Sequence, residues 1–137
     1  MAGNVEQGTK SSGGGAGEGL WRNGKVSYMQ IPALDTERSA AFYAAVFGWT
    51  IRGDASHRSF EDASGELIGA FVTDRRVAAD SGILPYVYVE GIDEMIERIE
   101  AHGGRTVRAP YPEGDLWVAT FHDPAGNLLG VWQRGPR

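Results

Sequence analysis

The chain has 137 residues, of which 42% are hydrophobic and 23% are charged, with a formal net charge of −5 and no cysteine. This length and composition predict a single globular domain with a core of its own. The lack of cysteine excludes disulfides, thiolate metal sites and a cysteine nucleophile. Nucleic acid is not an expected partner, because the 13 basic residues are scattered among 18 acidic ones.

The longest apolar run, residues 40–49, has about half the length of a bilayer span, so no membrane crossing is expected. Residues 1–23 are rich in glycine, serine and charge. Residues 1–19 have no apolar segment of the kind that a secretory signal needs, and they are not arginine-rich like a transit peptide. This composition predicts a flexible N-terminal arm, a cytoplasmic location and a folded domain over residues 24–137.

The first half of this domain predicts a strand, a helix and three further strands. The strand at residues 25–31 is stopped by Pro32, which cannot donate to a ladder. Asp35 then occupies an N-cap position, and Gly48 suits the left-handed C-terminal position of the helix between them. Three short strands are predicted at residues 49–52, 57–61 and 66–72, with the turn DASG before the last.

The second half repeats this order after a polar linker at residues 74–82. A strand is predicted at 84–89 and a helix after it, with strands at 106–109, 116–121 and 128–133. The helix is indicated by apolar residues at three- and four-residue steps. These residues are Ile92, Met95, Ile96 and Ile99.

Two phrases of the sequence occur twice. DASGELIGAF at 62–71 is matched by DPAGNLLGVW at 123–132, and GWTIR at 48–52 is matched by GRTVR at 104–108. A solenoid needs at least about three stacked units, so a unit that occurs twice excludes one. The sequence therefore predicts two βαβββ modules, at residues 24–73 and 83–134, that pack against each other.

Strand alternation divides the side chains between two faces. The aliphatic set is expected against the helices, which leaves a second face that is aromatic and nearly uncharged. The side chains predicted on the helix side are Met29, Ile31, Val87, Val89, Leu129 and Val131. Those predicted on the opposite side are Tyr28, Gln30, Tyr86, Tyr88, Leu128, Gly130 and Trp132.

The helix segment RSAAFYAAVFGW after a strand ending IPALD, together with DPAGN before the closing strand, resembles the vicinal oxygen chelate superfamily. This superfamily includes glyoxalase I, extradiol dioxygenases and fosfomycin and bleomycin resistance proteins. The chain is most similar to its glyoxalase-like, lactoylglutathione-lyase-related group. The resemblance spans residues 25–134 and implies an α+β fold of two tandem βαβββ modules forming curved mixed sheets. It also implies a homodimer, since family members often complete their cups between subunits.

Metal enzymes of this superfamily place one ligand near the start of the first strand and one in the last strand of each half. The family pattern and the internal repeat assign these positions to Tyr28, Gly69, Leu84 and Gly130. Divalent metals bind histidine nitrogen or carboxylate oxygen, which none of the four residues offers. The resemblance therefore implies the scaffold without its metal, and no metal or cofactor is expected.

Three histidines are the remaining candidates for chemistry. His102 follows the second helical stripe, where it suits a capping role at the helix C-terminus. His122 precedes a turn that it can order by a hydrogen bond, while His57 is placed to reach the rim of a cup. No carboxylate pair is fixed by spacing, and GxSxG, P-loop and GxGxxG motifs are absent from the sequence.

The sequence thus predicts a protein that binds a small neutral, apolar or aromatic molecule in an aromatic-lined cup. Gly69 and Gly130 are expected to leave room in this cup. One alternative is a glyoxalase-like lyase or isomerase, or a dioxygenase-type enzyme, with no metal or with an unusual one held through Gln30 or His57. Another is a subunit whose paired sheets serve assembly, and the rings can also simply fill the core. The predicted ligand-binding residues are Tyr28, Gln30, Tyr86, Tyr88, Trp132 and His57.

Overall fold

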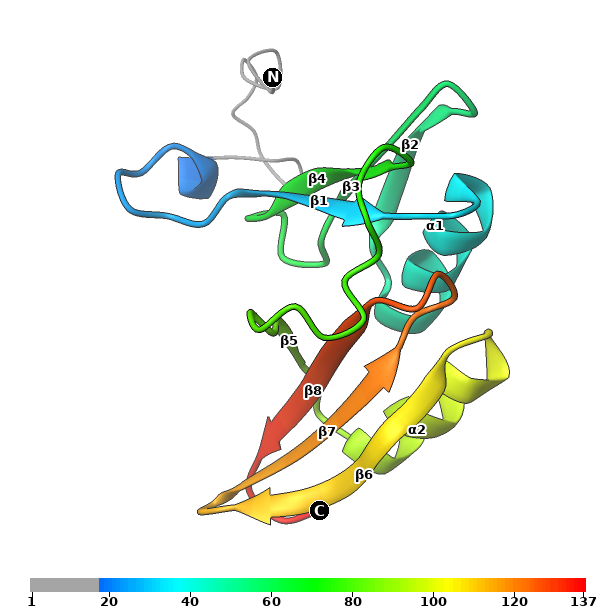
Figure 1. Cartoon of the computed structure of the whole chain (residues 1–137). Helices are drawn as coiled ribbons and strands as arrows, with labels where there is room; N and C mark the ends of the chain where they lie inside the picture. The colour runs from blue at the N-terminus through cyan, green and yellow to red at the C-terminus, as the bar shows by residue number, and fades with distance from the viewer. Residues whose placement is uncertain (1–17) are drawn as a thin grey trace.

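A computed structural model describes residues 18–137 and contains two helices and eight strands in that range (Figure 1). Most of the predicted N-terminal arm, residues 1–17, lies outside the described part of the chain. The elements follow in the order η3 (Glu18–Leu20), β1 (Tyr28–Pro32), α1 (Thr36–Phe47), β2 (Thr50–Asp54), β3 (His57–Glu61), β4 (Ile68–Val72), β5 (Tyr86–Tyr88), α2 (Ile92–Ala101), β6 (Arg105–Glu113), β7 (Leu116–His122) and β8 (Leu128–Arg134).

The strands form two four-stranded mixed sheets, with the orders β1-β4-β3-β2 and β5-β8-β7-β6. In each sheet the first strand pairs in parallel with the last, and the other pairings are antiparallel. The predicted α+β class with two βαβββ modules is confirmed. Within residues 18–137 no helix is long and apolar enough to span a membrane.

The signals predicted for the first helix are confirmed by its caps. The Asp35 carboxylate accepts hydrogen bonds from the backbone N–H groups of Glu37 and Arg38, at 3.0 and 3.2 Å. Gly48 ends α1 in the left-handed conformation, with a φ of 74°. The second helix has no side-chain cap of its own. Instead, the Gln133 side chain of β8 accepts from the Ile92 N–H at 2.7 Å, which ties α2 to its sheet.

One hydrophobic core runs through both modules. Within the first module, Tyr43 of α1 stacks on Trp49, with ring centroids 4.7 Å apart. Phe42 and Phe47 of the same helix approach Phe121 of β7, with ring centroids 6.1 and 6.0 Å apart. These two pairs join the first module to the second, because Phe121 belongs to the second sheet.

The predicted division of the strands into two faces is also confirmed. Ile31, Val89 and Val131 are buried in the core, whereas Tyr86 and Tyr88 keep 42% and 46% of their surface exposed. We call the side of each sheet that points away from α1 and α2 the open face. The exposed tyrosines of β5 belong to the open face of the second sheet.

The sequence repeat and the structural repeat differ by one residue. The Asp62 N–H donates to the Leu67 carbonyl, whereas the Asp123 N–H donates to the Asn127 carbonyl, so the first turn is one residue longer. As a result Gly69 pairs with Met29, on the helix side of its sheet, whereas Gly130 pairs with Tyr86 on the open face.

The prediction that Gly69 leaves room in a cup is therefore wrong. A Cβ atom on Gly69 would collide with the Met29 carbonyl and with the ring of Phe60, which is a core residue. The residue that occupies the position of Gly130 in the first sheet is Ala70, which pairs with Gln30. Glycine at position 69 is required by close packing of the core.

A buried polar cluster, made by Asp123 and its partners, connects the modules. One oxygen of the Asp123 carboxylate accepts from the backbone N–H groups of residues 125–127, at 2.9 to 3.0 Å. The other accepts from the Tyr43 hydroxyl at 2.7 Å and from the Asn127 amide at 2.9 Å. The Asn127 amide also donates to the Pro32 carbonyl at 2.7 Å, and its oxygen accepts from the Ala78 N–H at 2.8 Å.

This cluster joins the end of β1, helix α1, the linker and the turn before β8. Burial, followed by the nearby Asp123 charge, raises the pKa of Tyr43 well above its usual value of 10.0. The phenol therefore stays protonated and keeps donating to the carboxylate. The DPAGN motif consequently has a structural role, because its two polar side chains fix how the modules sit together.

Candidate ligand-binding site

The predicted site residues of the second sheet form one aromatic cluster on its open face. Tyr88 and Trp132 are register partners in β5 and β8, and their rings meet edge to face with centroids 4.8 Å apart. Tyr86 lies two residues before Tyr88 on the same face of β5 and pairs with Gly130. A Cβ atom on Gly130 would collide with the Tyr86 ring, so the space predicted to be empty at Gly130 is filled by that tyrosine.

The predicted residues of the first sheet are more dispersed. Tyr28 and Gln30 both lie exposed on β1, at alternate positions of the open face. His57 begins β3 and is exposed in the β2–β3 hairpin, which lies far from β5 in Figure 1. The structure therefore brings Tyr86, Tyr88 and Trp132 together and leaves His57 apart from them.

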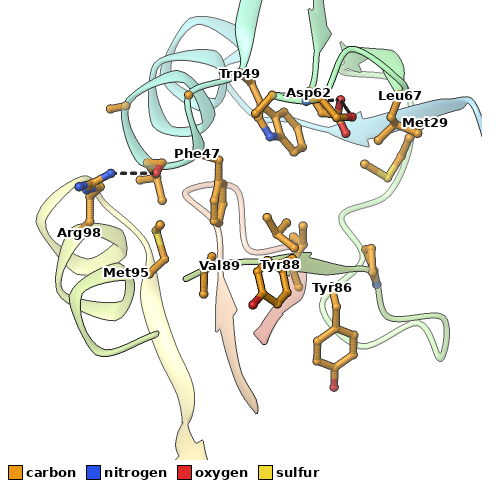
Figure 2. A pocket seen from close by; sticks show the side chains of 18 of the residues that line it. Met29, Phe47, Trp49, Asp62, Leu67, Tyr86, Tyr88, Val89, Met95 and Arg98 are labelled. Carbon is orange, nitrogen blue, oxygen red and sulfur yellow. Dashed lines mark hydrogen bonds between the residues drawn. The ribbon is translucent and has the colours of Figure 1, made fainter. Parts of the chain in front are cut away.

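A groove of about 640 Å³ lies between the two modules (Figure 2). We call it the seam groove. One wall comes from the C-terminal end of α1 and from the first sheet, the other from β5 and α2. Among the residues that line it are Met29, Phe47, Trp49, Leu67, Tyr86, Tyr88, Val89 and Met95.

The seam groove and the aromatic cluster share strand β5. Tyr86 and Tyr88 border the groove, and the register of β5 with β8 puts their side chains on the open face beside Trp132. In Figure 2 the Tyr86 ring points away from Trp49 and Met29 on the opposite wall. Strand β5 thus borders the groove and carries two tyrosines that belong to the open face of the second sheet.

The charged side chains at the groove are already engaged by other groups. The Arg98 guanidinium donates to the Val46 carbonyl at 3.5 Å, as Figure 2 shows. The Asp62 carboxylate accepts from backbone N–H groups of its own turn, from residues 64–66, at 2.9 to 3.3 Å. What remains of the lining is chiefly apolar, which suits a neutral, apolar part of a ligand.

Strand β6 adds two residues to the open face that the sequence analysis missed. Arg108 pairs with Thr120 and Tyr111 with Val118, and Thr120 in turn pairs with Gly130 at the centre of the sheet. The guanidinium carbon of Arg108 lies 3.4 Å from the centre of the Tyr111 ring. The strand predicted at residues 106–109 is longer in the structure, where β6 continues through two prolines to Glu113. Proline is tolerated there because β6 is an edge strand.

The two other histidines have structural partners. The His102 ring nitrogen Nδ1 lies 3.0 Å from the Arg98 carbonyl, in agreement with a role at the end of α2. Arg105 donates to Nδ1 of His122 at 3.1 Å, which leaves Nε2 to donate to the Ala79 carbonyl at 3.4 Å. His122 thereby holds the linker against the second sheet.

The residues at the four family metal positions do not fit a divalent cation. With the register corrected, these positions hold Tyr28, Ala70, Leu84 and Gly130, which provide one phenol and no imidazole or carboxylate. Across residues 18–137 no three histidine, aspartate or glutamate side chains gather in a way that could hold a metal ion. His57 and Gln30 have no such group around them either.

Two βαβββ modules with these sheet orders form the fold of the vicinal oxygen chelate superfamily. A family model described as a glyoxalase-like domain matches residues 28–132, and the chain belongs to that family. It is 28% identical over 122 residues to a glyoxylase-like domain-containing protein of Didymella fabae, covering 82% of this chain and 95% of the fungal one.

The chain is also 26% identical over 132 residues to the anthracycline biosynthesis protein DnrV of Streptomyces peucetius. That match covers 82% of this chain and 48% of DnrV. A mycobacterial relative, CFP32 of Mycobacterium bovis, is matched over 47% of its length. The chain therefore spans about half the length of these two curated relatives.

Solved structures with the same fold include a glyoxalase/bleomycin resistance protein/dioxygenase family enzyme from Burkholderia phytofirmans. Its TM-score is 0.67 at 19% identity, and the match covers 80% of this chain and 98% of that one. The antibiotic binding protein TnmS3 from a Streptomyces species has a TM-score of 0.60 at 20% identity, with 80% and 95% covered. These similarities establish the fold.

Proposed function

We propose that this protein binds a small, planar and largely apolar molecule, and that it does so without a metal ion. The observation that carries the proposal is that the seam groove and the aromatic cluster of Tyr86, Tyr88 and Trp132 meet at strand β5. A groove of about 640 Å³ is within the range of small-molecule sites, which is about 300 to 1,000 Å³. Edge-to-face rings such as Tyr88 and Trp132 provide flat surfaces against which an aromatic ligand stacks.

The comparisons support a binding role in general terms. DnrV is named for anthracycline biosynthesis, and TnmS3, which has the same fold, is named as an antibiotic binding protein. The residues at the family metal positions support binding without a metal ion, because alanine, leucine and glycine side chains cannot coordinate one. For this chain we therefore place binding ahead of metal-dependent catalysis.

The proposal is tested by two titrations of the purified protein. A library of planar aromatic compounds, followed by tryptophan fluorescence, is expected to contain compounds that quench the emission with saturable binding, because Trp49 lines the groove and Trp132 belongs to the aromatic cluster. A panel of Zn²⁺, Ni²⁺, Mn²⁺ and Fe²⁺, followed by calorimetry, is expected to show no stoichiometric binding. Tight binding of one ion at a 1:1 ratio would instead favour an enzyme with an unusual metal site.

We also propose that two copies associate through the free edges of the sheets. Strands β1 and β5 each pair with a neighbour on one side only. The apolar side chains next to them include Val26 before β1 and Ile83 before β5, and Ile83 is 87% exposed. Exposed apolar residues beside an unpaired strand edge are typical of an interaction surface.

Light scattering at about 50 µM protein is expected to give the mass of a dimer. Replacing Ile83 by aspartate would put a charge on the proposed contact and is expected to shift the population toward monomer. The variant Val107→Asp, at an exposed apolar residue of β6 on the far edge of the second sheet, serves as the control. A monomer in the unaltered protein at this concentration would contradict the proposed dimer.

A further inference from the structure

Strand β6 is irregular where its counterpart in the first module is regular. The register of β2 with β3 runs without interruption over five residue pairs. The register of β6 with β7 shifts twice, between Thr106 and Arg108 and again between Arg108 and Tyr111. A β-bulge of this kind re-aims side chains, and bulges are frequent beside binding sites.

The two shifts determine which residues share the open face. In an uninterrupted strand Thr106 and Arg108 would point the same way, and Arg108 and Tyr111 would point to opposite sides. In the structure Thr106 pairs with the core residue Phe121, whereas Arg108 and Tyr111 pair with Thr120 and Val118 on the open face. The short distance between the Arg108 guanidinium and the Tyr111 ring confirms that they share a side.

Arg108 has a counterpart in the first module. The repeated segments GWTIR and GRTVR end in Arg52 and Arg108, respectively. The two arginines occupy corresponding positions, since Arg52 pairs with Ser59 and Arg108 with Thr120. Arg52 donates to the buried Glu61 carboxylate at 2.9 Å. Within residues 18–137 Arg108 takes part in no ion pair and no side-chain hydrogen bond. Its guanidinium lies over the Tyr111 ring, and its charge acts on the Tyr86 phenol as well.

The charge of the surrounding face differs from that of the whole molecule. The chain carries a net charge of −5, but the open face of the second sheet holds three arginines and one glutamate. These residues are Arg105, Arg108, Arg134 and Glu113. A local excess of positive charge beside an aromatic cluster is complementary to an aromatic anion.

We propose that Arg108, held on the open face by the bulges of β6 and by the Tyr111 ring, anchors an acidic group of a planar aromatic ligand. The inference rests on the proposed binding function and narrows it to molecules that carry a carboxylate, sulfonate or ionised phenol. In the register of the sheet Gly130 and Thr120 lie between Tyr86 and Arg108, and the Tyr86 ring extends over Gly130 toward β6. The aromatic part of the ligand then lies toward Tyr86 and Trp132, and its acidic group lies toward Arg108. The free guanidinium offers planar paired donors that match such a group.

Two fluorescent probes with one aromatic skeleton test this inference: anilinonaphthalene sulfonate, which is an anion, and phenylnaphthylamine, which lacks the sulfonate. The unaltered protein is expected to bind the anion more tightly than its neutral analogue. In the Arg108→Gln variant the affinity for the sulfonate should fall about tenfold at low salt. The affinity for phenylnaphthylamine should change by less than about twofold, because its aromatic contacts are unaltered.

Arg52→Gln is the matched control, because Arg52 is neutralised by Glu61, and it is expected to leave the affinity for both probes unchanged. Arg108→Lys keeps the charge without the planar fork and should lose part of the affinity for the sulfonate. Equal affinity for both probes, or an equal effect of the two glutamine variants, would overturn the inference while leaving the binding function intact. Failure of both probes to bind would overturn both.

Discussion

The Asp123→Ala variant will lose about 3 to 5 kcal/mol of unfolding free energy, which is the range expected when a fully bonded buried charge is removed. Asp123 is 3% exposed and accepts five hydrogen bonds, from three backbone N–H groups, the Tyr43 hydroxyl and the Asn127 amide. Its removal leaves the Tyr43 hydroxyl and the Asn127 backbone N–H buried without this acceptor. Because domains of this size are stable by about 5 to 15 kcal/mol, much of the total stability is at stake.

Urea unfolding followed by tryptophan fluorescence measures this loss, and the repeat provides the control. Asp62 is the sequence counterpart of Asp123, but its carboxylate bonds only within its own turn, to Ser64 and the following N–H groups. Asp62→Ala should therefore cost about 1 kcal/mol, as for the loss of a local cap. Similar losses in the two variants would show that Asp123 merely orders a turn and does not join the modules.

The Trp132→Ala variant will lose measurable binding of aromatic ligands while remaining folded. Trp132 is only partly buried and packs edge to face on Tyr88, so truncation removes one wall of the proposed site. The expected cost in stability is about 1 to 3 kcal/mol, less than for a buried tryptophan. Titration with a quenching compound from the aromatic library, together with a urea curve, separates the two effects.

Trp117→Ala is the matched control for this experiment. Trp117 lies on the neighbouring strand β7, and it pairs with Gln133, one residue beyond Trp132 on β8, so its ring is on the helix side of the sheet. Its truncation should lower stability and leave ligand affinity within about twofold. If Trp132→Ala unfolds the protein instead, Trp132 is a core residue and the proposed site is wrong.

The arrangement of elements could be predicted because its signals are local. Asp35 and Gly48 mark the ends of α1 through side-chain and backbone preferences that act within one turn. Alternation in β1 and β5 placed Tyr28, Tyr86 and Tyr88 on the exposed side, since the period of a strand depends only on its own residues. That the two modules form one fold was predicted from the resemblance to a known family, because local sequence signals carry no information about how modules pack.

The errors of the sequence analysis arise from single extra residues. Glu66 lengthens the first turn, so Gly69 moves to the core side although it aligns with Gly130 in the sequence. Val107 lies in the first register shift of β6, which separates the directions of Thr106 and Arg108. A slip of one residue reverses the face of every following side chain, and the amino-acid pattern alone does not show where the slip occurs.

The seam groove was missed for a different reason. Phe47, Trp49 and Met95 belong to helical or core patterns, and nothing in their spacing shows that they line a gap between modules. The gap depends on how far the modules stand apart, which is fixed by the contact of α1 with Phe121 and by the cluster around Asp123. Such long-range geometry is beyond what periodicity can predict.

The hydrogen bonds of Asn127 to Pro32 and Ala78 make the protein a candidate for fragment complementation, because they join segments on the two sides of the linker. A cut in the linker gives two fragments that divide the partners of the cluster around Asp123 between them, and it exposes the aromatic contacts of α1 with Phe121. The cut separates Asn127 from Pro32 and Ala78, and Asp123 from the Tyr43 hydroxyl, so each fragment alone is expected to fold poorly. Mixed together, the fragments should reconstitute one another, and a split reporter built at residues 79–82 would turn that reassembly into a signal.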